Sequence, residues 1–192
     1  GYGLYEPVHL VIRDDFIIED VTVRTRLNGE ITVFAELGYN VFTDYKQFAG
    51  KDFLDLSVCE YGGGKEVARR TFEINRKKNL INIAVPEPKL WWPNTYGDPN
   101  LYELRLTLRR EGEVLDSRTE RFGIRTVRIA EDPVGDEHRL TCRMVVNGKP
   151  VYSKGANWVP LDYRTGIIAD EQYRQSLALA KQGNINMLRV WG

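Results

Sequence analysis

The hydrophobic pattern of the chain changes once, between Val145 and Asp162, and this change constrains the fold more than any other feature. Before it, apolar and polar residues alternate in short runs separated by turn residues, which is typical of antiparallel strands. After it come a short apolar run, a long loop, an amphipathic stretch and a second apolar run. The sequence therefore predicts an all-β region followed by a strand–helix–strand unit.

An Asn-Gly pair stands at the start of this change. Asn147-Gly148 separates the short apolar runs Met144–Val146 and Pro150–Tyr152. Because Asn-Gly is the strongest short hairpin signal, we expect these runs to pair. The second arm then continues into Lys154–Ala156 and presents Asn157-Trp158 to a long loop. A strand that stops at small residues and then offers an amide and an indole is a candidate for the start of a site.

Composition narrows the class of partner. The 192 residues include 42% apolar residues, 27 basic and 27 acidic side chains, so the chain is globular and its net charge is zero. No long-range field attracts nucleic acid or an anionic membrane, and a neutral or small polar partner is expected. The apolar runs are too short to span a membrane, and the first residues lack the features of a signal peptide. We expect a soluble protein, with the compartment left open.

Cysteine usage argues against both a disulfide framework and a metal centre. Cys59 and Cys142 are the only cysteines, and no His or Cys nearby completes a ligand set. We interpret both as free thiols. The sequence suggests no metal site and no cofactor.

Residues 13–128 predict an immunoglobulin-like β-sandwich. About seven short alternating runs separated by turns fit two antiparallel sheets that bury their inner faces against each other. The clearest pair runs from Val21 to Leu27 and from Ile31 to Leu37, and its Asn28-Gly29 turn has a type I′ signature. Inward-facing positions of the later runs are Leu54, Leu56, Val58, Ile81, Ile83, Val85, Tyr102, Leu104, Leu106 and Leu108.

Two stretches of this region have competing interpretations. Gly62–Gly64 resembles a phosphate-binding loop, but no Lys-Ser/Thr pair or helix follows, so we favour a hairpin tip. The aromatic residues of Leu90–Tyr102 could form a sugar-stacking platform or a corner whose indoles cover the open end of the sandwich. We favour the corner, because the prolines and Gly97 make this a structured connection.

The remainder of the chain predicts a linker and one parallel crossover unit. Ala130–Glu137 has no periodicity and reads as a linker or hairpin tip. A helix capped by Asp170 and stopped at Gly183 would precede a strand over Ile185–Trp191. Its predicted buried stripe is Tyr173, Leu177 and Ala180. One such unit cannot bury both faces, so it must lean on the sandwich, on a second copy or on residues beyond this chain.

Four motifs, taken together and in this order, resemble glycoside hydrolase family 2, and its β-mannosidase branch in particular. Trp158 follows Asn157 where the family's galactosidases and glucuronidases usually have a His or a Lys-His pair, and the strand ending in Trp191 is similar to that of the mannosidases. The motifs are Leu90–Pro93 with Gly97, Pro99, Leu101 and Tyr102; Phe122–Arg125; Val146–Pro150 with Lys154–Trp158; and Asn186–Gly192.

The resemblance implies a division of the chain into three parts. Residues 1–12, with a strand-like run at Pro7–Ile12, would be the last strand of a preceding jelly-roll sugar-binding domain, as if the chain were cut from something longer. Residues 13–128 would be the immunoglobulin-like domain. Residues 129–192 would be a linker and the beginning of a (β/α)8 barrel, the catalytic domain of the family.

The activity implied by the resemblance is retaining hydrolysis of terminal β-D-mannose residues by two carboxylates. We expect no catalytic residue in this chain, because the family's glutamates lie on later barrel strands and the acids after Pro150 are only Asp162, Asp170 and Glu171. The alternatives are another family activity (exo-β-glucosaminidase, β-galactosidase or β-glucuronidase) or a non-catalytic structural or carbohydrate-binding module.

The resemblance also implies a substrate-binding wall at the ends of two barrel strands. Arg189 would hold a catalytic carboxylate ionised, and the indoles would face the C–H surface of a sugar. The competing interpretations are an ion pair inside the barrel for Arg189 and core packing for the indoles. We also expect self-association through the incomplete barrel. The candidate wall is Asn157, Trp158, Asp162, Arg189 and Trp191.

Overall fold

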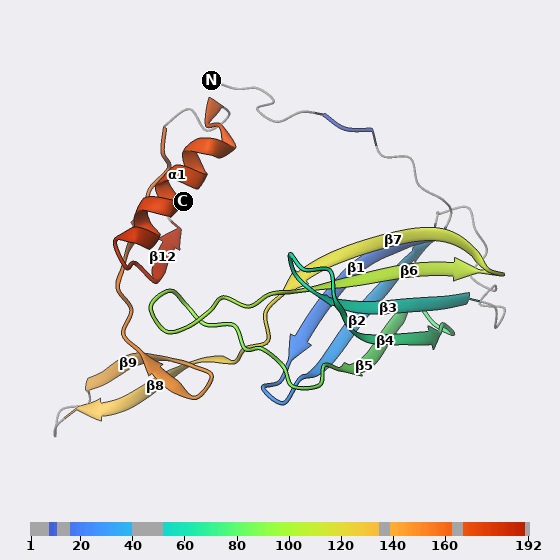
Figure 1. The fold of residues 1–192 in the computed structure, drawn as a ribbon, viewed down its shortest axis with the longest axis horizontal. Coiled ribbons are helices and arrows are strands. Elements are labelled where there is room, and N and C mark those ends of the chain that lie inside the picture. Colours follow the sequence, from blue (N-terminus) through green and yellow to red (C-terminus); the bar gives the residue numbers. More distant parts are fainter. Residues whose placement is uncertain (1–7, 11–15, 40–51, 135–138, 163–166, 191–192) are drawn as a thin grey trace. The chain divides into compact units, whose positions relative to one another are not determined.

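The computed structural model describes residues 8–10, 16–39, 52–134, 139–162 and 167–190, and strands dominate this part of the chain (Figure 1). The chain divides into two compact units. The sandwich unit consists of residues Ile12–Trp91 and Pro99–Thr126. The second unit consists of Gly1–Val11, Trp92–Asp98 and Val127–Gly192.

The sandwich unit contains two antiparallel sheets, as the alternating pattern predicts. One sheet has the order β1-β2-β5 and the other the order β4-β3-β6-β7. Because β5 returns beside β2 and β6 beside β3, the topology is the Greek key of an immunoglobulin-like domain. The strands are β1 (Phe16–Thr25), β2 (Glu30–Tyr39), β3 (Asp52–Glu60), β4 (Glu66–Glu73), β5 (Lys78–Ala84), β6 (Tyr102–Arg110) and β7 (Glu113–Phe122).

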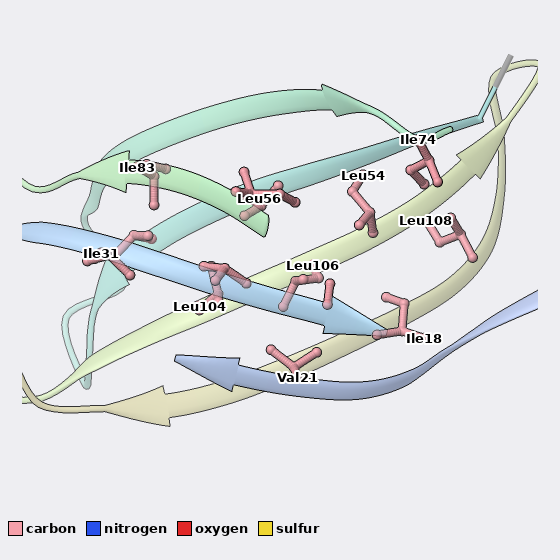
Figure 2. Close-up of a cluster of buried hydrophobic side chains, with 14 of the residues drawn as sticks. Ile18, Val21, Ile31, Leu54, Leu56, Ile74, Ile83, Leu104, Leu106 and Leu108 are labelled. Atoms are coloured by element: carbon pink, nitrogen blue, oxygen red, sulfur yellow. The ribbon is translucent and has the colours of Figure 1, made fainter. Parts of the chain in front are cut away.

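The two sheets bury their inner side chains against each other. Figure 2 shows aliphatic residues of both sheets pointing into the space between them, and every residue labelled there is buried. Burying one such side chain stabilises a fold by about 1.5–3 kcal/mol. The labelled residues are Ile18, Val21, Ile31, Leu54, Leu56, Ile74, Ile83, Leu104, Leu106 and Leu108.

A bulge in β1 changes which residues of the strand face the core, so even-numbered positions face it before the bulge and odd-numbered positions face it afterwards. The register with β2 shifts between Ile18 and Asp20, so Glu19 is the additional residue. Ile18 and Val21 are therefore both buried although they are an odd number of positions apart. Strict alternation from Val21 alone does not predict this.

The turn between β1 and β2 is not the predicted type I′ turn. Asn28 keeps a negative φ, and only Gly29 has a positive value, of 87°. The Gly29 N–H donates to the Arg26 carbonyl at 3.0 Å, which is a type I turn followed by a glycine bulge. The glycine is required twice over, because a Cβ at this position would lie 2.1 Å from the Val85 carbonyl oxygen. Gly62 and Gly64, by contrast, form the expected hairpin tip between β3 and β4.

The aromatic connection between β5 and β6 is divided between the two units. Trp91 belongs to the sandwich unit, where the Arg125 guanidinium lies 4.2 Å from its ring centroid and Gly123 leaves room for the indole. This position supports the corner interpretation for Trp91. Trp92 instead groups with the second unit. The Lys149 ammonium of the same unit lies 5.4 Å from the Trp92 ring centroid. For Trp92 the corner interpretation stays a prediction.

The second unit contains a three-stranded antiparallel sheet of order β10-β9-β8. Its strands are β8 (Val127–Val134), β9 (Arg139–Val146) and β10 (Lys149–Val151). The linker interpretation of Ala130–Glu137 is wrong as far as Val134, because this polar stretch pairs with β9 along its length, and the rest of it lies outside the described residues. The predicted hairpin at Asn147-Gly148 is confirmed, with φ values of 50° and 78°. The expected continuation of its second arm into Lys154–Ala156 is wrong, because β10 ends at Val151 and the next strand, which starts at Gly155, belongs to another sheet.

The predicted strand–helix–strand unit is present and its strands are parallel. It consists of β11 (Gly155–Trp158), α1 (Asp170–Gln182) and β12 (Met187–Val190). Asp170 is the first helical residue and not the cap. The cap position is Ala169, whose N–H donates to the Gln172 side-chain oxygen at 3.0 Å.

The apolar stripe of α1 is not buried in this chain. Tyr173 is 36% exposed and Leu177 is 48% exposed, and no residue of the helix is buried. The expectation of a buried stripe is therefore wrong, while the argument that the unit cannot bury its own faces stands. At the other end of the chain, Val8–Leu10 has no regular secondary structure, and the rest of the predicted strand at residues 7–12 lies outside the described residues.

Candidate functional site

Two of the predicted site residues are direct partners in the parallel pair. Asn157 on β11 is in register with Arg189 on β12, and Trp158 is in register with Val190. Because parallel strands end at the same edge, their last side chains gather there. The strand–helix–strand unit therefore brings together residues that are 32 positions apart in the sequence.

A hydrogen bond joins this pair. Arg189 Nη1 donates to Asn157 Oδ1 at 3.3 Å, and both side chains are exposed. A guanidinium has five N–H donors, so one contact with an amide oxygen leaves capacity for a bidentate carboxylate. The Asn157 amide thus orients the Arg189 guanidinium, whose paired N–H groups can bind a carboxylate or two sugar hydroxyls.

Gly155 sets the spacing that allows this contact. A Cβ at Gly155 would lie 2.5 Å from the Met187 carbonyl oxygen, which real Cβ atoms do not approach. The missing side chain lets the β12 backbone approach β11 at the first residue of the pair. From there, alternation places Asn157 and Arg189 on the same face.

The other predicted residues are less closely associated. Trp158 is half-buried at the end of β11, and Asp162 is half-buried in a bend further along the loop. Trp191 lies outside the described residues. The candidate site is therefore a contacting pair, Asn157 and Arg189, with an indole next to it along the strand.

Sequence reasoning missed three side chains that bind the backbone just before β11 and β12. Asn94, Tyr96 and Asn186 hydrogen-bond to backbone groups where β11 and β12 begin. The available signal was Asn186, which immediately precedes β12 and whose amide can bond two backbone groups at once. Asn94 and Tyr96 gave no such signal, because their positions in the sequence assign them to the sandwich.

The described residues offer little that would support other chemistries. Across these residues, no His, Cys, Asp or Glu side chains gather in the groups of three or more that could hold a metal ion. Cys59 is buried and Cys142 is exposed, and both are free thiols. None of the described helical segments is long and apolar enough to cross a membrane.

The sequence and the fold are both similar to known proteins. The family model described as "Glycosyl hydrolases family 2" matches residues 16–125. "Beta-mannosidase B" of Aspergillus flavus is 38% identical over 129 residues, which are 67% of this chain and 15% of that protein. "Beta-mannosidase B" of Emericella nidulans is 39% identical over 129 residues, again 67% of this chain and 15% of that protein.

Two solved structures place the fold in the same context. The β-D-mannosidase of Dictyoglomus thermophilum has a TM-score of 0.74 and 34% identity, over 94% of this chain and 22% of that chain. A β-glucuronidase of Bifidobacterium dentium has a TM-score of 0.69 and 24% identity, over 91% of this chain and 27% of that chain, and this likeness concerns the fold alone. The chain thus spans 15% of the length of the two curated relatives named above and 22% of the mannosidase structure.

Proposed function

Because the chain belongs to glycosyl hydrolase family 2, we propose that it is part of a retaining exo-glycosidase, a β-mannosidase that removes terminal β-D-mannose residues. The observation that carries this proposal is the sequence identity to two kinds of mannosidase, fungal and bacterial, which exceeds the identity to the β-glucuronidase. The parent protein, meaning the longer protein proposed to contain this chain, carries the activity.

The chemistry of retention requires two carboxylates about 5–5.5 Å apart, one acting as nucleophile and one as acid and base. After Pro150 this chain offers Asp162, Asp170 and Glu171. Asp170 and Glu171 lie in the first turn of α1, where negative charge stabilises a helix. Glu171 also accepts a hydrogen bond from Gln175 at 3.1 Å. We therefore assign the catalytic pair to parts of the parent protein outside this chain.

The role proposed for this chain is binding and orientation. Arg189, steered by Asn157, holds a catalytic carboxylate in its ionised form by a paired hydrogen bond. Trp158 and Trp191 present indole faces to the C–H surface of the sugar, and Asp162 accepts hydrogen bonds from its hydroxyls. The proposal involves no metal and no cofactor.

The test is hydrolysis by the parent protein of a panel of nitrophenyl glycosides. Turnover of the β-mannoside above the β-galactoside, β-glucuronide and β-glucosaminide is expected, and NMR of the first product should show the β anomer. Preference for another glycoside would replace the mannosidase assignment by that activity. The chain by itself should give no turnover above an unrelated protein, because it lacks the carboxylate pair.

The alternative is a non-catalytic module whose sandwich positions other domains or binds carbohydrate. Both forms of this alternative predict that the parent protein hydrolyses none of the panel. The carbohydrate-binding form also predicts that the isolated chain binds mannosides in calorimetry. Turnover of the panel by the parent protein would exclude a non-catalytic parent, and a chain without measurable affinity would exclude the carbohydrate-binding form.

A further inference from the structure

A group of side chains outside the proposed wall holds the beginnings of β11 and β12. We call Asn94, Tyr96 and Asn186 the clasp. Asn94 and Tyr96 lie between β5 and β6 in the sequence, yet the segment Trp92–Asp98 groups with the second unit. The second compact unit therefore combines β11, α1 and β12 with a loop that lies much earlier in the sequence.

Asn94 joins the end of α1 to the beginning of β12. Its side-chain nitrogen donates to the Lys181 carbonyl at 3.0 Å and to the Ile185 carbonyl at 3.1 Å. The first is one of the last helical carbonyls, and it also accepts the Asn184 N–H at 3.1 Å. A side-chain amide has two N–H donors, and both are used here. Asn94 thereby adds two hydrogen bonds to the turn from which β12 starts.

Tyr96 and Asn186 hold the segment that leads into β11. The Tyr152 N–H donates to the Tyr96 hydroxyl at 2.8 Å. Asn186 donates to the Tyr152 carbonyl at 3.1 Å and accepts from the Lys154 N–H at 2.9 Å. Backbone groups on both sides of Tyr152 are thus fixed, one by the loop and one by the residue preceding β12.

The Trp92–Asp98 loop is itself ordered by internal contacts. The Trp92 N–H donates to the Asp98 carbonyl at 3.1 Å, and the Tyr96 N–H donates to the Pro93 carbonyl at 3.1 Å. The Lys149 ammonium lies 5.4 Å from the Trp92 ring centroid. A loop with such contacts presents Asn94 and Tyr96 in fixed positions, so little entropy is lost when they bind the strand segments.

We infer that Asn94 and Tyr96 are positioning residues for the Asn157–Arg189 pair. Beyond the clasp, β11 starts at Gly155 and β12 starts at Met187, and these two residues are partners in the parallel pair. Two positions further along each strand, Asn157 and Arg189 are partners in the same register. Over so short a distance, a shift at the clasp moves the pair itself. The part of this inference that concerns substrate rests on the proposed function, whereas the part that concerns the strands does not.

The test compares three variants of the chain by amide hydrogen exchange. Tyr96→Phe removes the acceptor of the Tyr152 N–H, and exchange there should accelerate about fivefold to tenfold, the effect of one ordinary hydrogen bond. Asn94→Asp keeps the shape of the side chain but replaces its two N–H donors by a carboxylate, which repels the Lys181 and Ile185 carbonyls. Amide exchange should therefore accelerate across β12. The control is Asn100→Asp, because Asn100 makes the same kind of bond, to the Leu90 carbonyl at 3.0 Å, within the sandwich unit.

A second readout separates positioning from general stability. Below the onset of unfolding, the NMR signals of the Asn157 side-chain amide and the Arg189 Nε–H should shift in Tyr96→Phe and Asn94→Asp and stay in place in Asn100→Asp. Wild-type exchange and wild-type signals in both clasp variants would overturn the inference. Neither measurement involves a sugar, so this outcome is distinct from a failure of the mannosidase proposal.

Discussion

Arg189 donates to the side-chain oxygen of Asn157, its direct partner in the parallel β11–β12 pair, across 3.3 Å. The contact orients the guanidinium along the edge where the strands end. An amide cannot neutralise the cation, so the positive charge of Arg189 stays available for a carboxylate. This relationship makes Arg189 the residue of the chain whose replacement tests the proposed role most directly.

Replacing Arg189 with Ala in the parent protein should lower kcat/KM for a β-mannoside at least about 100-fold, which corresponds to about 3 kcal/mol. The reason is loss of the proposed paired contact between Arg189 and a catalytic carboxylate. Steady-state kinetics provides the measurement, with Arg174→Ala on the exposed face of α1 as the matched control. Wild-type kinetics in the Arg189 variant would leave Arg189 with a structural role only.

Gly155→Ala should separate β11 from β12. The added Cβ would approach the Met187 carbonyl oxygen to 2.5 Å, so the backbones must move apart, at a cost of about 1–3 kcal/mol. Amide exchange of residues 187–190 should accelerate accordingly. Gly63→Ala is the control, because a Cβ there has nothing within 4 Å. Equal behaviour of the two variants would show that β12 does not depend on this close approach.

The sandwich should depend on the ion pair between Asp52 and Arg110. Asp52 is 1% exposed, and Arg110 contacts it with two nitrogens at 2.7 and 3.0 Å. Arg110→Ala leaves the buried Asp52 carboxylate without this partner and should lower the free energy of unfolding by about 2–3 kcal/mol. This is less than the cost for a fully buried ion pair, because water reaches the Arg110 side chain. Urea denaturation measures the change.

The control for this ion pair is Arg69→Ala. Arg69 pairs with Glu66 at the surface, at 3.1 Å with 71% of its side chain exposed. Its removal should change stability by about 0.5 kcal/mol or less. A similar loss in both variants would contradict the assignment of a special role to Asp52.

Glu36 should contribute stability that depends on pH. The hydrogen bond from Lys77, with the nearby charge of Lys78, lowers the pKa of Glu36 below 4.5. A carboxyl with a lowered folded-state pKa stabilises the fold above its unfolded pKa and loses that contribution as the pH falls through the folded value. The advantage of wild type over Glu36→Gln should therefore be full at neutral pH, vanish in acid and shrink with salt. Urea denaturation midpoints of wild type and Glu36→Gln, measured at neutral and at acidic pH, test this. The same difference between the two proteins at both pH values would refute it.

The exposed apolar side chains of α1 should promote self-association. Leu177 is 48% exposed and Leu179 is 67% exposed. At about 25 cal/mol per Å² of apolar surface, covering these side chains with a second copy of the chain is favourable. Light scattering over a concentration series should show a rising mass for the chain. Replacing both leucines with Gln should restore a monomer, whereas Leu80→Gln on β5 should not. A monomer at every concentration would end this proposal.

The sequence by itself determined the architecture of the sandwich and the parallel unit. In a strand with one face in water and one in the core, apolar residues recur at every second position, and this period is visible in the sequence. A helix that ends at Gly183 between two apolar runs predicts a crossover connection between two parallel strands. The sequence also placed Arg189 near the end of the apolar run that became β12. It did not specify β11, because the apolar run Pro150–Tyr152 that was expected to lead to Asn157 pairs with β9 as β10, and β11 is the separate strand Gly155–Trp158. The features that were predicted correctly are local consequences of the order of residues, so they can be read from that order.

Only the tertiary structure decided how distant segments combine. The bulge at Glu19 changes the parity of β1. A type I turn stands at Asn28-Gly29 where a type I′ turn was expected, and there the Gly29 carbonyl accepts the distant Val85 N–H at 3.0 Å, a contact that no local preference specifies. The polar residues of β8 form a strand because β9 supplies their backbone partners. Asn94 reaches the end of α1, 87 positions later in the chain, through hydrogen bonds whose partners no sequence pattern specifies. Such pairings depend on the fold that brings the partners within 3 Å or so, and this is why the clasp was visible only in three dimensions.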